Sequence, residues 1–264
     1  MKFGIICGHG NGDPGASSTV YGTEANMVRQ LAPFIQRYLV NYADTVIFDT
    51  SRNLYEFLKT NSYSFSGFDY IIELHGNAGA HDQSGNGVTT GIEVWVTSSE
   101  EGITVEQNIC TKISDTFGMK NRGVKVTDFF VIRTIKDQGI SSCLIENGFI
   151  DDKDDMKIIF SNMEGYCKTL AEAIAEGFGL KRSTVSPIIM YCVQCGPICT
   201  EEEANELSEE LKDNGYNTYI VTSGDDHYVQ AGAYTVFSNA ESLVKKLAED
   251  GFDAKITTKQ LQKK

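Results

Sequence analysis

Four side chains that could hold a metal ion or move a proton stand where apolar runs end or a helix begins. His9 lies in "GHGNGDPG" after the run "FGIIC", and His75 follows the run "DYIIEL". Glu24 follows Thr23, a residue type that caps helix N-termini, and Glu146 follows the run "SSCLI". A catalytic zinc ion needs three protein ligands of the His, Asp, Glu or Cys type and one open position. These four residues are therefore candidates for one such site.

The glycines around His9 do not fit two common phosphate-binding motifs. A dinucleotide loop that starts at Gly8 would need glycine where the chain has Asp13, and no Gly-Lys-Ser/Thr follows for a P-loop. We therefore interpret the glycines as clearing space around the imidazole for a bulky ligand. Asp13, which precedes Pro14, is expected to shape the turn.

The first 180 residues alternate short buried runs with helical periodicity. Short runs rich in β-branched and aromatic residues predict strands at 3–7, 45–48, 69–74, 91–96 and 141–145. Apolar residues at helical spacing predict helices at 24–40, 104–118 and 164–179. This alternation predicts an α/β domain with a largely parallel sheet, whose ligand lies beyond the carboxyl ends of the strands.

The last third of the chain contains an internal repeat. Residues 181–187, "KRSTVSP", are polar, end in proline and predict a linker. Beyond them, the segment from Tyr191 aligns without gaps on the segment from His227, a shift of 36 positions. Each half predicts strand, helix and strand, so the two would form one small α+β domain of βαββαβ type over 188–264.

Three cysteines of the repeat, Cys192, Cys195 and Cys199, precede His227 and suggest a metal knuckle at first sight. Residues three apart on a strand point to opposite faces, and the repeat aligns these cysteines with ordinary sheet residues. We therefore expect small core residues rather than metal ligands.

Three blocks resemble the signatures of the zinc-dependent N-acetylmuramoyl-L-alanine amidases of the Amidase_3 family. They are "GHGNGDPGA…GTE", "ELHGNAGA…GIEVWV" and "VIRTIKDQGISSCLIENGFIDDKDD". The resemblance implies a twisted, mainly parallel sheet flanked by helices and cleavage of the amide between N-acetylmuramic acid and L-alanine in peptidoglycan. It also implies one catalytic Zn²⁺ held by His9, Glu24 and His75, with Glu146 as the catalytic carboxylate.

The repeat looks like a SPOR (sporulation-related repeat) domain, because "VQCG" and "VQAG" are each followed by a helical pattern and by "NGY" or "DGF". That resemblance implies binding to glycan strands that lack stem peptides. The predicted domains are a zinc amidase domain at 1–180, the linker at 181–187 and a SPOR-like peptidoglycan-binding domain at 188–264.

Two further residues are weaker candidates for substrate binding. His81, in "AGAHDQSG", is expected in a loop at the rim of the site, where a solvated histidine is the favoured interpretation. Arg133 occupies a basic position of the third block and is expected to follow a strand, where it could meet a substrate carboxylate. Trp95 could serve either the core or sugar binding.

Charge and composition limit the partners. A formal net charge of −13 argues against nucleic acid, whose binding needs clustered Lys and Arg. The start "MKFGIICGHG" is too short an apolar stretch for a signal peptide, and no later run approaches a membrane span. We therefore expect a protein made in the cytoplasm without a signal peptide or membrane insertion, which reaches the wall after holin- or lysis-dependent release.

The favoured function is that of a phage endolysin that lyses its host, with the glycan strands and stem peptides of peptidoglycan as partners. A mother-cell or cell-wall autolysin of a spore former with the same reaction is an alternative. A zinc peptidase that cuts within the stem peptide and a non-catalytic wall-binding protein are the others.

Overall fold

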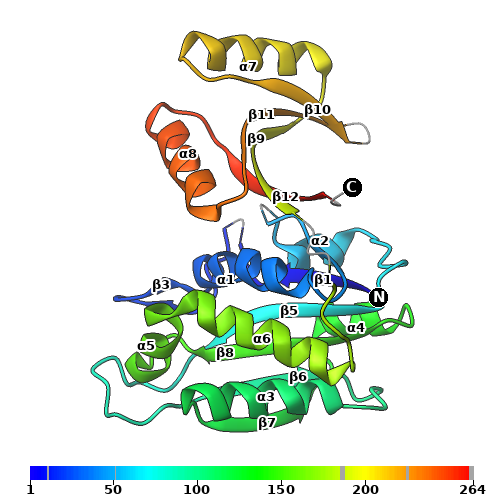
Figure 1. The fold of residues 1–264 in the computed structure, drawn as a ribbon, viewed down its shortest axis with the longest axis vertical. Helices are drawn as coiled ribbons and strands as arrows, with labels where there is room; N and C mark the ends of the chain where they lie inside the picture. Colours follow the sequence, from blue (N-terminus) through cyan, green and yellow to red (C-terminus); the bar gives the residue numbers. More distant parts are fainter. Residues whose placement is uncertain (11, 51, 185–187, 224–225, 262–264) are drawn as a thin grey trace. The chain divides into compact units, whose positions relative to one another are not determined.

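The structure, a computed structural model, describes residues 1–10, 12–50, 52–184, 188–223 and 226–261 (Figure 1). Its internal contacts divide the chain into two compact units, Met1–Thr184 and Val185–Lys264. The predicted linker falls partly on residues 185–187, which lie outside the described residues. Within the described ranges, no helix combines the length and the apolar character that crossing a membrane requires.

A six-stranded sheet forms the centre of the N-terminal unit (Figure 1). In spatial order its strands are β4 (Asp44–Ile47), β1 (Lys2–Cys7), β5 (Tyr70–Asn77), β8 (Ser141–Phe149), β6 (Ile92–Val96) and β7 (Asn121–Val126). Neighbouring strands are parallel except β6 and β8, which are antiparallel. A short hairpin of β2 (Ser17–Ser18) and β3 (Gly22–Thr23) precedes the first helix. The predicted mainly parallel sheet is confirmed.

Helices cover both faces of this sheet, because its inner strands carry apolar side chains on both faces. The helices are α1 (Glu24–Leu39), α2 (Leu54–Thr60), α3 (Thr104–Phe117), α4 (Phe130–Lys136), α5 (Lys153–Ser161) and α6 (Met163–Gly177). Phe3 and Ile5 of β1 belong to the larger core, which α1, α3, α5 and α6 share. Ile6 belongs to a second core with Leu58 of α2 and Val131 of α4. The sheet is therefore buried between two helical layers.

The C-terminal unit is a four-stranded antiparallel sheet with two helices (Figure 1). In spatial order its strands are β10 (Tyr219–Ser223), β11 (Asp226–Tyr234), β9 (Ile188–Ile198) and β12 (Lys255–Leu261), and its helices are α7 (Glu201–Asp213) and α8 (Phe237–Glu249). Cys195 of β9 and Leu207 of α7 line one pocket, and a Cβ added at Gly232 of β11 would lie 2.6 Å from Leu243 Cδ2 of α8. The chain order β9-α7-β10-β11-α8-β12 is the predicted βαββαβ arrangement, which is confirmed.

The two halves of the repeat meet at a pair of glutamines. Gln194 of β9 lies opposite Gln230 of β11, and these are residues that the shift of 36 positions aligns. The Gln194 Nε2 donates to Gln230 Oε1 at 3.2 Å, and both side chains are buried. Val193, next to Gln194, pairs with Gly232, which faces α8. Since neighbours along a strand alternate, the glutamine pair lies on the face away from the helices.

The cysteines of the repeat are not equivalent. Cys192 and Cys195 are buried, as predicted for small core residues. The same prediction is wrong for Cys199, which is exposed and lies just beyond the end of β9 at Ile198.

Candidate active site

Three neighbouring strands bring the predicted site residues to one edge of the sheet. His9 follows the end of β1 with a positive φ of 59°, a conformation that is uncommon for non-glycine residues and concentrates at functional sites. His75 and Glu146 are direct partners in the β5–β8 ladder. The expectation that His75 and Glu146 follow the ends of their strands is wrong. The pairing of β5 with β8 continues beyond them, to Asn77 and Phe149.

Three potential ligand atoms converge at this edge. The Nε2 of His9 lies 3.1 Å from Glu24 Oε1, and the Nδ1 of His75 lies 2.8 Å from the same oxygen. One ligand atom from each of the three residues lies within 4.8 Å of the other two. Glu24 begins α1 directly after Thr23, whose side chain accepts a hydrogen bond from Asn26 N and so fixes the helix start. Residues far apart in sequence thus form one compact donor cluster.

The second nitrogen of each imidazole lies near another carboxylate. The Nδ1 of His9 is 2.8 Å from Asp13 Oδ2, while Asp13 Oδ1 accepts from Gly15 N at 3.0 Å. The Nε2 of His75 is 3.3 Å from Glu73 Oε1. A carboxylate on the far side of a histidine ring is typical of metal-binding histidines, because it fixes the tautomer and the ring orientation.

From the sequence, Asp13 is predicted only to shape the turn, and Glu73 is not predicted as a site residue. Asp13 does shape the turn through Gly15 and, in addition, orients His9. Glu73 lies two residues before His75 on the same strand and therefore on the same face. A lone carboxylate inside an otherwise apolar strand was the signal that could have found it.

Glycines of the first loop make room for the site's own side chains. A Cβ added at Gly8 would lie 2.4 Å from His75 Cε1, and one at Gly15 would lie 2.6 Å from Glu24 Oε2. Both distances are shorter than real Cβ contacts allow. The glycines were expected to leave space for a bulky ligand. At Gly8 and Gly15 the space is filled instead by the side chains of the site itself.

The two carboxyl groups of the site, Glu24 and Glu146, have pKa values shifted in opposite directions. Burial alone would raise the pKa of Glu24, but hydrogen bonds from His75 and His9 hold that pKa well below its ordinary value. Glu24 is therefore ionised, as a metal ligand must be. Burial raises the pKa of Glu146 to about 7, and its Oε2 has no hydrogen-bond partner among the described residues. A carboxyl group with that pKa can accept and release a proton near neutral pH.

The two weaker candidates lie outside the donor cluster. The side chain of His81 is 88% exposed, and its backbone N–H donates to Asp151 Oδ2 at 2.9 Å. This agrees with the favoured interpretation of a solvated loop histidine. Arg133 does not follow a strand, since it lies on the exposed side of α4 near the Phe130 ring. The apolar residues Val131 and Ile135 bury the other side of that helix, which explains why the segment is helical.

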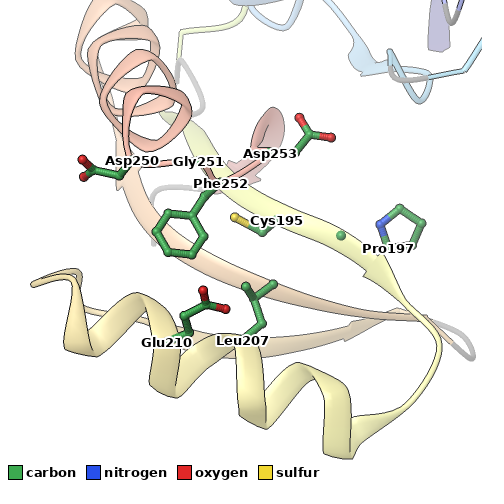
Figure 2. Close-up of a pocket in the computed structure, with 9 residues that line it drawn as sticks. Cys195, Pro197, Leu207, Glu210, Asp250, Gly251, Phe252 and Asp253 are labelled. Atoms are coloured by element: carbon green, nitrogen blue, oxygen red, sulfur yellow. The ribbon is translucent and has the colours of Figure 1, made fainter.

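A pocket in the C-terminal unit contains none of the predicted site residues (Figure 2). Its volume is about 500 Å³, and Figure 2 shows Leu207 and Glu210 of α7 extending toward Cys195 and Phe252. Its wall carries carboxylates and no imidazole. The pocket therefore does not contribute to the donor cluster of the N-terminal unit.

The donor cluster fits a catalytic zinc ion. Two imidazoles and one carboxylate are a ligand set of catalytic zinc sites, which keep a further position open. Asp13 orients His9, Glu73 lies 3.3 Å from His75 Nε2 without forming a regular hydrogen bond, and Glu24 is held ionised. Glu146 stands beside His75 in the adjacent strand. This combination of sheet and side chains fits a hydrolase that uses a bound metal ion and one carboxyl group.

The family model of N-acetylmuramoyl-L-alanine amidase, Amidase_3, matches residues 4–179, and the SPOR domain model matches residues 223–264. The chain therefore belongs to the N-acetylmuramoyl-L-alanine amidase family. The SPOR match covers the second half of the internal repeat.

Similar proteins include a sporulation-specific N-acetylmuramoyl-L-alanine amidase of Bacillus subtilis (strain 168), 26% identical over 229 residues that cover 84% of each chain. The amidase CwlM of Bacillus licheniformis is 26% identical over 227 residues, covering 84% of this chain and 85% of that one. Among solved structures, the catalytic domain of the CD27L endolysin, which targets Clostridia difficile, has 25% identity and a TM-score of 0.52, covering 67% and 97% of the two chains. The amidase AmiC2 of Nostoc punctiforme has the same fold, with 21% identity, a TM-score of 0.50 and 66% and 93% coverage.

Proposed function

We propose that this protein hydrolyses the amide bond between N-acetylmuramic acid and L-alanine in peptidoglycan, with one Zn²⁺ held by His9, Glu24 and His75. The observation that carries the proposal is the convergence of three ligand atoms within 4.8 Å, beside Glu146, in a chain of this amidase family. Zn²⁺ bound there would supply Lewis-acid activation of the amide carbonyl and of water.

Glu146 would carry the proton. It would take one from the attacking water and deliver it to the nitrogen of the departing L-alanine. The second transfer is needed because an amide anion is a very poor leaving group. Burial raises the pKa of Glu146 in the metal-free site, which would help this carboxyl group to hold the proton between the two transfers. Asp13 would keep His9 in the ligating tautomer and orientation.

Product analysis tests the bond that is cut. The full chain, loaded with Zn²⁺, is expected to release whole stem peptides with a free L-alanine amino terminus from purified peptidoglycan, as measured by mass spectrometry. A zinc peptidase would instead release shorter peptides and leave L-alanine on the glycan. Detection of L-alanine still attached to the muramic acid after complete digestion would contradict the proposal.

We also propose that residues 188–264 bind glycan strands that lack stem peptides. The SPOR match supports this, and the 13 acidic against 7 basic residues after position 182 suit an uncharged glycan better than an anionic polymer. The full chain with Glu146→Gln, which should not digest its ligand, is expected to sediment with amidase-treated glycan strands. A matched Glu146→Gln chain that ends at Thr184 should stay in solution. If both chains sediment equally, or neither does, the binding role is wrong.

The biological setting that we propose is a cell-wall autolysin of a spore former. Support comes from the sporulation-specific relative, whose similarity extends over 84% of this chain, whereas the endolysin similarity is to a catalytic domain and covers 67%. Transcription of the gene during sporulation would agree with this setting. A holin gene next to it would favour the endolysin interpretation instead.

A further inference from the structure

A buried glutamate of β6 lies directly beside the proposed catalytic carboxyl group. Glu93 pairs with Glu146 across β6 and β8, and Glu146 pairs with His75 across β8 and β5. Directly paired residues on neighbouring strands point to the same face of a sheet. His75, Glu146 and Glu93 therefore form a row across β5, β8 and β6 that leads from the donor cluster toward β7. Glu93, at the end of this row, is 2% exposed.

Four donors occupy the carboxylate of Glu93. Its Oε1 accepts from Asn77 Nδ2 at 2.8 Å and from Trp95 Nε1 at 3.2 Å. Its Oε2 accepts from Arg122 Nε and from Lys125 Nζ, both on β7. A carboxylate offers about four acceptor positions, so Glu93 has none left for a ligand. Glu93 is therefore a positioning residue that holds two cations next to the site.

The two cations remain partly accessible. The side chains of Arg122 and Lys125 are 26% and 32% exposed. Arg122 lies 4.8 Å from the Phe149 ring centre, and Lys125 lies 5.0 Å from that of Trp95, which limits their freedom. Among the described residues, the hydrogen bonds of Arg122 run from Nε to Glu93 and from Nη1 to the Thr90 carbonyl at 3.5 Å. Two cations against one anion leave an excess positive charge at this place in a chain of net charge −13.

We propose that Arg122 and Lys125 bind a free carboxylate on the second residue of the stem peptide. This specificity rests on the proposed amidase function. In the substrate, the lactyl carboxyl group of the muramic acid is consumed in the scissile amide, so the free carboxylates belong to the peptide. A positioned guanidinium and a neighbouring ammonium form strong, charge-assisted hydrogen bonds with a carboxylate.

The distance between the two cations and Glu146 favours a carboxylate on the second residue of the stem peptide. Neighbouring strands are about 4.8 Å apart, so cations held at Glu93 lie roughly 5–10 Å from the proton-carrying group on β8. An extended peptide advances about 3.5 Å per residue. A carboxylate on the glutamate that follows L-alanine falls within this range, whereas the same position as an amide would carry no charge.

The test compares two N-acetylmuramoyl peptides that differ only in residue two, isoglutamate or isoglutamine, with the zinc-loaded full chain. The wild type is expected to favour the isoglutamate substrate about ten-fold in kcat/KM, mainly through KM. Arg122→Gln is expected to reduce this ratio to about one, and Lys125→Gln to reduce it by roughly half or more.

Lys120→Gln is the matched control, because Lys120 is exposed just before β7 and makes no contact with Glu93. Its substrate ratio should equal that of the wild type. Lys125→Gln leaves Arg122 on Glu93, so it keeps the test informative if Arg122→Gln does not fold. Equal hydrolysis of both substrates by the wild type, or an equal loss of preference in Lys120→Gln, would overturn the inference while leaving the amidase function intact. Failure to hydrolyse either substrate would instead count against the amidase function.

Discussion

Glu146→Gln is expected to lower kcat on purified cell walls about 10³-fold, while the protein still binds one zinc ion per chain. A positioned general base or acid contributes about 10²–10⁴-fold, and a factor of 10³ corresponds to about 4 kcal/mol in the barrier. Glutamine fills the same volume but cannot take the proton from water. The measurements are turnover of dye-labelled walls and zinc content by elemental analysis.

Glu106→Gln provides the matched control for this loss. Glu106 of α3 is also buried, and burial raises its pKa, while the Tyr70 hydroxyl donates to it. It belongs to no part of the donor cluster. This variant should therefore keep wild-type turnover within about three-fold. A Glu146→Gln protein that digests walls at the wild-type rate with normal zinc content would show that the proton is carried elsewhere.

Removal of zinc is expected to reduce activity more than about 100-fold, and added Zn²⁺ should restore it. The Glu24→Gln and His75→Ala proteins should each contain less than one zinc ion per chain, because each variant lacks one of the three ligands. Asp13→Asn should have a graded effect, with zinc affinity weakened about 10–100-fold, since it only orients His9. Zinc titration of the metal-free proteins measures all three.

His227→Ala is the control for the loss of a histidine, because His227 lies in the C-terminal unit and its ring contacts Thr222. It should retain one zinc ion per chain. Circular dichroism of the metal-free wild type distinguishes loss of the ion from loss of the fold. Full activity in protein shown to contain no zinc would refute the assignment of the donor cluster.

The elements that position the site were predictable because each consists of a buried apolar run followed by a polar residue. β1, β5 and β8 have such runs, and α1 begins with a capping threonine and an acidic first turn. β7 was not predicted, because an edge strand with the sequence "NRGVKV" carries charges in place of an apolar run. α2 and α4 were missed because seven residues give too few turns to show a helical period.

The partners of the site residues were harder to predict, because they depend on the order of strands in the sheet. Glu93 lies 53 positions before Glu146, and no local feature shows that β6 enters the sheet antiparallel beside β8. Arg122 and Lys125 belong to the strand that the sequence analysis missed. The four residues that carry the proposed chemistry were therefore accessible from local patterns, whereas the charged residues that would select the substrate were not.

The glutamine pair of the C-terminal sheet has a consequence for a polymeric ligand. Gln194 and Gln230 occupy the middle of a row that continues to Lys255 on β12 and to Tyr219 on β10, residues that the repeat places at equivalent positions. The row is symmetric at its centre, but one end presents an ammonium group and the other a phenol. Because both glutamines are buried, the accessible groups of the row lie at its two ends, and a chain laid along it would meet different chemistry in its two orientations.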